Sequence, residues 1–534
     1  MNSGIESQNS PVVQHSNCGA NADARGAQTT LERLLLPSIP DLIFIVLLIA
    51  FTYGSLAPRL LWDGDVGWHI RNGQNILAAH AIPRVDSFSE TMAGRPWYSW
   101  EWLYDAAIGG MYNWAGLNGV VFANALVIAL TLALVFALGL RRSGNLAVTL
   151  VLFVFCAVAS SIHFLARPHV VGWLITIVWF WILDSADRNQ SRISRVLWLP
   201  LIMLLWANVH GGFVLGFVLL AIYVAASVLT LLRCRVAHQR AAAKKRISIL
   251  IAAGISSFLT SLINPYGIRL HEHVYAYLTN RFYMQHINEF RRPDVHGLPT
   301  QFFLILVLLT VVAIIARKGR LRWAGALVIL FSTVSGLWAA RNLPVASMLL
   351  VIVVAPLLAP APRDSVDTTP QRWRLLRARF SSGQLISGWH LWPLVLVLMT
   401  LVVCSHHGNF LGKQMMDAHF DLSRFPIRAV DFLEKQGIRE PVYSLDSWGG
   451  YMIWRLYPQT KVFVDDRHDF YGEQFVRDYL KVLHAQPGWQ EVLNQLKVNI
   501  VLLPAKSKTN DALSRSGEWQ IVYQDSVADI FERH

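Results

Sequence analysis

The sequence Asp63-Gly-Asp65-Val-Gly-Trp-His69 places two carboxylates and an imidazole just after the first long apolar segment of the chain. Charged side chains are costly inside a bilayer and are usually functional where they gather at its edge. A carboxylate can take a proton from a hydroxyl group, and it can also bind a divalent metal ion. We therefore expect Asp63 and Asp65 to be catalytic, with His69 on the same helix face one turn after Asp65.

Each of these residues also has a structural interpretation. Asp65 would be the N-cap of an amphipathic helix over 66–79, where its side chain would accept hydrogen bonds from backbone amides. His69 would be a metal ligand, a hydrogen-bond donor or an interfacial packing residue. The span 82–102 is rich in Trp and Tyr, which favour the head-group zone of a membrane and stack on sugar rings. Glu101 lies there among tryptophans, and desolvation would raise its pKa and suit it to acid–base catalysis.

The composition is that of an integral membrane protein. Of the 534 residues, 54% are hydrophobic and 15% are charged, whereas soluble domains carry about 25% charged residues. The formal net charge of +13 would suit nucleic acid, but the basic residues lie in loops between apolar segments. We therefore expect the lipid bilayer as a partner and no nucleic acid.

The apolar runs predict about eleven membrane segments, because roughly 20 residues cross a bilayer. These runs lie near residues 39–58, 118–140, 145–166, 169–184, 196–209, 213–232, 247–263, 301–316, 323–340, 344–360 and 389–405. The 196–209 run is short and precedes His210-Gly-Gly, which indicates a half-helix. Residues 1–37 are interpreted as a disordered cytoplasmic tail. Residues 38–405 are interpreted as the transmembrane domain.

Orientation follows from the basic residues, which fall in alternate loops. They cluster at 141–142, 188–195, 233–246, 317–322 and 363–379. The positive-inside rule assigns these loops to the cytoplasm. The first loop (59–117), the turn at His210, the 264–300 loop and all residues after about 406 are then external.

The external side collects polar residues that stand at the outer ends of different membrane segments. A helix bundle could bring them into one cavity of carboxylates, imidazoles and guanidinium groups. Arginine binds phosphate through bidentate, charge-assisted hydrogen bonds, so such a cavity suits an anionic lipid head group. The candidate substrate-binding residues are His69, Arg167, His169, His210, Asn264, Glu289, Arg291 and Arg341.

These candidates also have plainer explanations. Arg167 and Arg341 could be anchors that snorkel to the membrane surface. Both would nevertheless lie outside, where the positive-inside rule disfavours arginine. His210, followed by two glycines, could mark a tight turn, and Glu289 could be an ordinary residue of a polar loop.

From about residue 406 the apolar runs shrink to strand length. Strands are expected at 441–445, 461–464, 499–503, 520–523 and 528–531, with helices near 424–437, 448–456, 472–484, 488–496 and 507–516. This alternation predicts an external α/β domain over 406–534 with a partly parallel sheet. The string Asp465-Asp-Arg-His-Asp469 follows a predicted strand, where α/β sheets place ligands. A surface loop with internal salt bridges is an equal alternative.

The first loop resembles that of bacterial membrane glycosyltransferases of the GT-C superfamily. The resemblance rests on Asp63, Asp65, Trp68, His69, Gly73, Pro83, Asp86, Ser87, Gly94, Arg95, Trp97, Glu101 and Trp102, and further on 206–212, 264–267 and 464–467. It implies an α-helical multispanning protein of the bacterial inner membrane that moves a sugar from a polyprenyl-phosphate carrier to a glycan, lipid or protein acceptor on the external face. It also implies that Asp63 or Asp65 is the base or holds a divalent metal ion, with inversion at the anomeric carbon.

Two other functions remain open. A transporter or flippase of lipid-linked glycans would need polar residues along the depth of the bundle, and the apolar segments are almost free of charge between their ends. A non-catalytic scaffold for envelope assembly would be favoured by a closed cavity. For the glycosyltransferase, the carrier phosphate is expected on Arg167, Arg341 or the Arg291–Arg292 pair.

Overall fold

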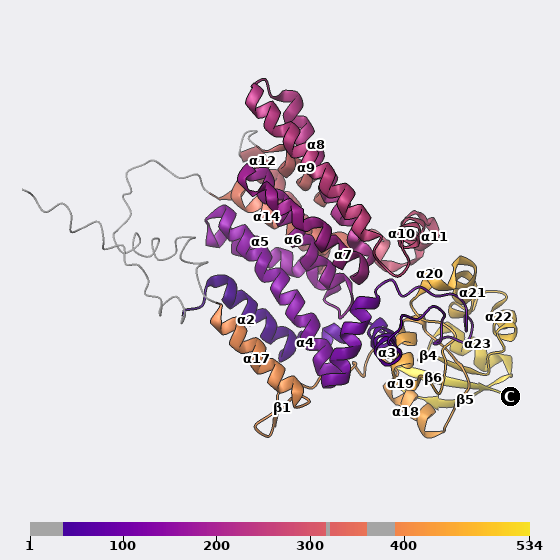
Figure 1. The fold of residues 1–534 in the computed structure, drawn as a ribbon. Coiled ribbons are helices and arrows are strands. Elements are labelled where there is room, and N and C mark those ends of the chain that lie inside the picture. The colour runs from indigo at the N-terminus through magenta and orange to yellow at the C-terminus, as the bar shows by residue number, and fades with distance from the viewer. Residues whose placement is uncertain (1–35, 317–320, 360–389) are drawn as a thin grey trace, which may run out of the picture.

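A bundle of long helices carries a smaller α/β domain at one end (Figure 1). The structure is a computed structural model and describes residues 36–316, 321–359 and 390–534. The tail expected at 1–37 lies, except for its last two residues, outside the described residues. So does the basic loop at 363–379.

Each of the eleven apolar runs contains an α-helix. The helices are α2 (Ile39–Thr52), α4 (Trp102–Ser143), α5 (Leu146–Ser160), α6 (His169–Arg188), α7 (Leu199–Val209), α8 (Val214–Arg233), α9 (Ala237–Ser261), α12 (Leu298–Ala316), α13 (Trp323–Trp338), α14 (Leu343–Leu358) and α17 (Leu391–Ser405). In the described part of the chain, seven helical stretches are long and apolar enough to cross a membrane, and α2, α13 and α17 are shorter apolar helices. The membrane-protein class is therefore confirmed, but the count of eleven spans is not.

The half-helix expected at 196–209 belongs to a longer element. A 3₁₀ stretch, η3 (Gln190–Trp198), runs directly into α7 and gives a 20-residue apolar span over Gln190–Val209. Short elements then connect the spans on the side of the α/β domain, namely η1 (Pro58–Leu61), η2 (Ser161–His163), η4 (Gly211–Phe213), α10 (Arg269–Thr279), α11 (Arg281–His286), η5 (Asn288–Phe290) and η6 (Ala340–Asn342).

The amphipathic helix expected in the first loop is α3 (Asp65–Ala79). It packs against the first part of α4, which is interrupted at Ala115 and Gly116. Gly116 has a φ of 61° there, a backbone conformation that favours glycine because a Cβ would clash. The interruption lets α4 lie beside α3 before its remainder joins the bundle.

The C-terminal domain has the expected α/β organisation. Its four-stranded sheet has the order β3 (Val442–Ser444), β4 (Ile500–Pro504), β6 (Ala528–Arg533), β5 (Trp519–Gln524), with β3 and β4 parallel and the other pairs antiparallel. Around it lie α18 (Ile427–Lys435), α19 (Asp446–Leu456), α20 (His468–Tyr471), α21 (Glu473–Leu483), α22 (Trp489–Gln495) and α23 (Lys508–Ser516), and a small hairpin, β1 (Asn409–Phe410) and β2 (Lys413–Gln414), precedes them.

The prediction of a strand at 461–464 is wrong. Val462 instead forms isolated parallel bridges, one with Val442 of β3 and one with Ser89 of the first loop. Because the segment makes one bridge to the sheet and one to the first loop, it does not form a regular strand with either of them.

The first loop and the C-terminal domain are closely packed together. Helix α3 lies against α19, and a Cβ added at Gly67 would lie 2.1 Å from the carbonyl oxygen of Gly450. A side chain at this position would force the two backbones apart. The loop also contributes backbone hydrogen bonds, from Glu90 N–H to Val462 O and from Val462 N–H to Phe88 O. The C-terminal domain is therefore fixed directly over the residues that the sequence marks as catalytic.

Candidate active site

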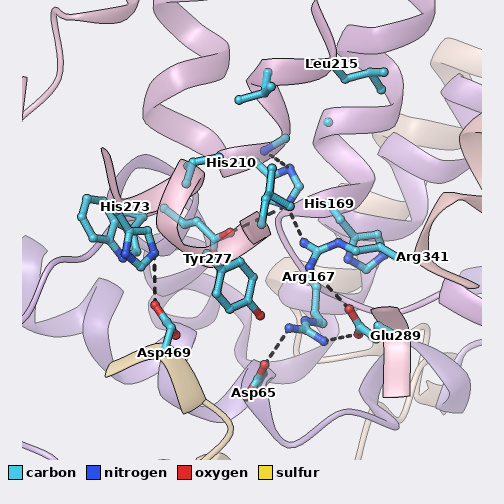
Figure 2. Close-up of a pocket in the computed structure, with 18 of the residues that line it drawn as sticks. Asp65, Arg167, His169, His210, Leu215, His273, Tyr277, Glu289, Arg341 and Asp469 are labelled. Atoms are coloured by element: carbon cyan, nitrogen blue, oxygen red, sulfur yellow. Dashed lines mark hydrogen bonds and ion pairs between the residues drawn. The ribbon is translucent and has the colours of Figure 1, made fainter. Parts of the chain in front are cut away.

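A cavity of about 430 Å³ lies between the C-terminal domain and the end of the helix bundle that faces it. Its polar end is lined by Asp65, Glu101, Arg167, His169, His210, Glu289, Arg341, Asp466 and Asp469. Its apolar end runs between α6, α8 and α14 and is lined by Trp173, Val214, Leu215, Val218 and Val345. Figure 2 shows Leu215 at the opposite end of the cavity from Asp65. The cavity is thus shaped for an amphiphile with a polar head and an apolar chain.

Arg167 is the centre of the polar end. Its guanidinium lies 2.9 Å from Asp63, 2.8 Å from Asp65 and 2.8 Å from Glu289 (Figure 2 shows the last two contacts). Burial disfavours the charge on Arg167, but these carboxylates outweigh burial and raise its pKa well above the usual value. Arg167 therefore stays charged and holds the acids of two different loops in one place.

The capping role that the sequence allowed for Asp65 is wrong. Helix α3 begins at Asp65 with Gly64 as N-cap, and it is the Asp63 carboxylate that accepts a hydrogen bond from the Asp65 amide, at 3.0 Å. The Asp65 side chain instead accepts from the Trp68 indole at 3.0 Å and pairs with Arg167. Burial raises the pKa of Asp65 to about 6, although Arg167 opposes the shift.

Glu101 lies beside a buried pair of residues, His69 and Asp105. Nδ1 of His69 is 2.5 Å from Asp105, and its Nε2 is 4.0 Å from Glu101. Burial raises the pKa of Glu101 to about 7, which suits a general base or acid near neutral pH. Burial would lower the pKa of His69, but Asp105 holds it above the usual value. Asn72 also donates to Asp105, at 2.5 Å, and so fixes its carboxylate.

The second arginine of the cavity, Arg341, has weaker contacts. It lies 3.6 Å from Glu289 and 3.2 Å from Nε2 of His210 (Figure 2). Burial would raise the pKa of Glu289, but Arg167 and Arg341 together hold it far below the usual value. Burial lowers the pKa of His210 to about 3, and the two arginines add to this shift. His210 is therefore neutral, and Glu289 is ionised.

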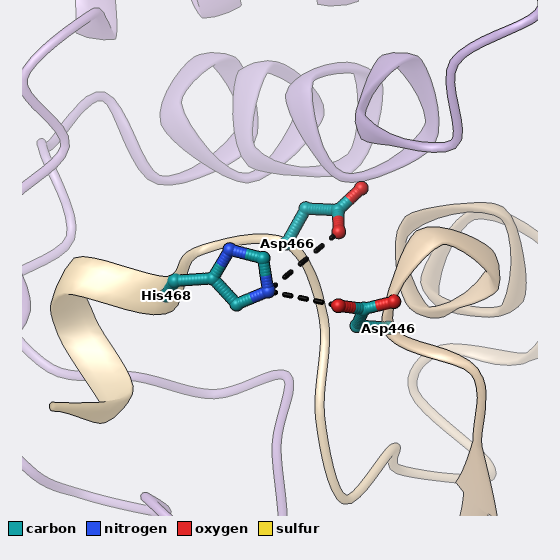
Figure 3. Close-up of side chains that lie close together, drawn as sticks. All are labelled: Asp446, Asp466 and His468. Atoms are coloured by element: carbon teal, nitrogen blue, oxygen red, sulfur yellow. Dashed lines mark hydrogen bonds and ion pairs between the residues drawn. The ribbon is translucent and has the colours of Figure 1, made fainter. Parts of the chain in front are cut away.

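Asp466 brings the C-terminal domain into the site. Oxygen atoms of Asp63, Asp65 and Asp466 lie within 4.8 Å of one another, and a second group within the same limit joins Asp466 to Asp446 and His468 (Figure 3). Burial and repulsion from the neighbouring carboxylates raise the pKa of Asp466 well above the usual value. Oxygen donors suit magnesium or manganese, and added imidazole suits zinc. A divalent cation would relieve this repulsion, so the donor set fits the metal expected at Asp63, Asp65 and His69, with Asp466 in place of His69.

Two of the sequence candidates lie away from the cavity. The Asn264 side chain closes a turn, donating to Ser261 O and Gly267 O and accepting from the Tyr266 amide. Arg291 is exposed and contacts Asn288 at 3.4 Å. The other candidates, including His169, line the cavity or contact residues that do.

Several residues at the site were not predicted from the sequence. They are Asn72, Asp105, His163, His273 and Tyr277. Asp105 had a detectable signal, because it is an acid one helical turn after Glu101 at the start of a long apolar helix. The aromatic residues of the span 82–102 do not all face outward, as residues at the head-group zone of a membrane would. Trp97 is buried, and Trp100 lines the cavity and stacks on His273 with ring centres 3.9 Å apart.

The fold of the chain is similar to that of a solved archaeal oligosaccharyltransferase. The archaeal oligosaccharyltransferase AglB from Archaeoglobus fulgidus, in complex with an inhibitory peptide and a dolichol-phosphate, aligns at a TM-score of 0.53 with 10% identity, over 87% of this chain and 69% of that one. The apo form of the A. fulgidus enzyme gives a TM-score of 0.52 with 11% identity over the same shares. ArnT from Cupriavidus metallidurans bound to undecaprenyl phosphate aligns at 0.48 with 13% identity, over 92% of this chain and 97% of that one.

No protein-family model and no curated protein sequence matches the chain. The chain has the fold of the Archaeoglobus fulgidus oligosaccharyltransferase, which agrees with the resemblance seen in its first loop. The identity to the archaeal oligosaccharyltransferase is low, so the similarity establishes the fold and not the chemistry.

Proposed function

We propose that this protein is a membrane glycosyltransferase that takes a sugar from a polyprenyl-phosphate carrier and transfers it to an acceptor hydroxyl or amide at the outer face of the membrane. The observation that carries the proposal is the cavity itself. Carboxylates and arginines gather at one end of it, and the other end runs into the apolar bundle. A lipid-linked sugar has the same division, with a phosphate and sugar at the head and a hydrocarbon chain behind. The A. fulgidus structure with dolichol-phosphate supports this class of ligand for the fold.

The acids have separable roles in this proposal. Asp63 and Asp65, fixed by Arg167, would accept the acceptor's proton or hold a divalent metal ion that supplies positive charge at the departing phosphate. Glu101 is the second candidate base, because its pKa of about 7 matches the task. Attack at the anomeric carbon from the side opposite the phosphate would invert that centre.

The arginines divide in a similar way. Arg167 is already paired with three carboxylates and would position the acids. Arg341, whose pairing with Glu289 is longer, would contact the carrier phosphate. Arg291 is exposed and lies outside the cavity lining, so it is no longer our candidate for the phosphate.

The test is lipid-linked sugar profiling in a deletion strain of the source bacterium. Loss of the protein should cause one polyprenyl-phosphate sugar to accumulate and one envelope glycan, lipid or protein to lack its sugar. Complementation with the wild type should reverse both changes. The double variant Asp63→Asn, Asp65→Asn should reach the membrane at normal levels and reverse neither.

Full complementation by that double variant would argue for a scaffold, because a scaffold does not need the two charges. Accumulation of the sugar carrier on the cytoplasmic leaflet alone would argue for a flippase. Either result would refute the glycosyltransferase proposal.

A further inference from the structure

Two hydrogen-bond donors face each other at the polar end of the cavity. The Gly212 amide donates to Nδ1 of His210 at 3.1 Å, within the turn that His210 caps. Arg341 lies 3.2 Å from Nε2 of the same ring, and the Glu101 carboxylate lies 3.8 Å from that nitrogen, which is too long for a hydrogen bond. An amide and a guanidinium can only donate, and a neutral imidazole accepts at one nitrogen. Because Nδ1 already accepts the hydrogen bond of the turn, the proton of the neutral ring lies on Nε2. The Nε2–H group then points toward the N–H groups of Arg341.

A third donor on the cavity wall has no acceptor. Trp206 is 1% exposed and lines the cavity, and no acceptor among the described residues lies within hydrogen-bonding distance of its indole Nε1. A buried N–H without an acceptor costs roughly 1–3 kcal/mol. Gly172 leaves space at this point, because a Cβ there would lie 3.1 Å from Nδ1 of His210 and 3.6 Å from Trp206 Nε1. The indole and the imidazole therefore border one small opening in the cavity.

Only a ligand with acceptor oxygens would satisfy all three donors. We propose that Arg341, His210 and Trp206 form an oxyanion subsite in the cavity, and that this subsite takes a carrier joined to its sugar through one phosphate rather than a diphosphate. The assignment rests on the proposed function and narrows its substrate class.

The charges of the site distinguish the two carriers. Arg167 is paired with three carboxylates at hydrogen-bond distance, those of Asp63, Asp65 and Glu289, so it has no free charge to offer. Arg341 contacts Glu289 at 3.6 Å, beyond a good hydrogen bond, and is the cation left for a ligand. His210 and Trp206 add donors without charge. One cation and two neutral donors match the single negative charge of a sugar phosphodiester, whereas a diphosphate would bring a second charge next to Glu101 and Glu289.

The proposal can be tested with two sugar-free probes that differ by one phosphate group and the charge that it carries. These are the methyl phosphodiester and the methyl diphosphodiester of one short polyprenol, titrated into the full-length protein in lipid nanodiscs with EDTA, so that no divalent cation offers a partner to the second charge. The phosphodiester should bind at least about tenfold more tightly, because the second charge of the diphosphate finds no partner among the side chains. Equal or tighter binding of the diphosphate would overturn the assignment and leave the glycosyltransferase proposal intact. Binding of neither probe would overturn both.

A tryptophan pair supplies the control for the subsite. Trp206→Phe removes the indole N–H and should weaken binding of the phosphodiester about tenfold. Trp179 is equally buried and its Nε1 is also without an acceptor among the residues that the structure describes, but it is not part of the cavity lining. Trp179→Phe should therefore leave the affinity unchanged. Equal affinities for the two variants would remove Trp206 from the subsite.

Discussion

The guanidinium of Arg467 lies 2.8 Å from the carboxylate of Asp86, although the two residues are 381 positions apart in the sequence. Arg467 also binds Asp465 through two further hydrogen bonds, at 2.8 and 2.7 Å, and its side chain is 5% exposed. Trp97 and Phe470 enclose the guanidinium. This buried arginine joins the C-terminal domain to the first loop and holds the neighbouring Asp466 against Asp63 and Asp65.

Arg467→Leu should destabilise the protein strongly, because it leaves Asp86 and Asp465 buried without a counter-charge. The expected loss is about 3–5 kcal/mol, measured as a lower unfolding temperature, and sugar transfer should fall with it. Arg477→Leu is the control, since its pair with Glu473 is half-exposed and should matter by no more than about 1 kcal/mol. Similar unfolding temperatures for the two variants would contradict the role assigned to Arg467.

The first-loop acids should be chemically essential. Asp63→Asn and Asp65→Asn keep the size of each side chain but remove its charge and basicity, and at least one should abolish transfer at normal protein levels. Asp417→Asn changes a carboxylate that is 74% exposed and should leave transfer unchanged. Full activity in both first-loop variants would make these acids structural.

The pH dependence of transfer tests Glu101. Its pKa of about 7 means that the carboxyl group is mostly protonated below this pH and cannot act as a base there. The rate should therefore rise roughly tenfold per pH unit below about pH 7 and level off above it. Glu101→Gln should abolish this rise of the rate with pH and lower the rate by about 10²–10⁴. Glu90→Gln, at an exposed position of the same loop, should keep the wild-type profile.

Arg341 should control the affinity for the carrier. Arg341→Ala should weaken binding of a short-chain polyprenyl phosphate about ten- to a hundredfold, as expected for the loss of one charged hydrogen-bond partner. Arg341→Lys should recover only part of the affinity, because a point charge does not reproduce the bidentate fork. Arg291→Ala is the control and should bind normally. Free replacement of Arg341 by lysine would instead indicate a membrane anchor.

The orientation of the chain can be measured directly. Reporter fusions after residues 320 and 420 should report opposite sides of the membrane, the first cytoplasmic and the second external, because the basic loops determine which side stays inside. Reports from the same side would break the expected alternation of segments.

Local patterns predicted the elements of the fold well. Apolar runs located the helices, and strand-length runs located β3, β4, β5 and β6, because both signals depend on neighbouring residues. The prediction of a strand at 461–464 was wrong because the structure of this segment depends on distant residues. Its hydrophobic pattern is that of a strand, but its hydrogen-bond partners are divided between the sheet and a loop more than 370 positions away.

The residues of the candidate site could be predicted only where charged side chains stand next to long apolar segments. Asp63, Asp65, Arg167 and Arg341 do so, and the structure gathers them. The contact of Asp466 with the first loop depends on how the two parts dock, which no local pattern records. Asn264 misled for a chemical reason, because the same amide that can bind a ligand also closes turns through backbone hydrogen bonds.

The hydrogen bond from Thr91 to the carbonyl of Phe463 spans 372 positions of the chain. Its two partners are therefore synthesised at different times. At ribosomal speeds of about 5–20 residues per second, the first loop is synthesised roughly 20–75 s before its partner segment. During that interval its tryptophans and aspartates have no domain to cover them. The candidate site is therefore assembled last, so a chain that stops before residue 463 would lack the contacts that complete it.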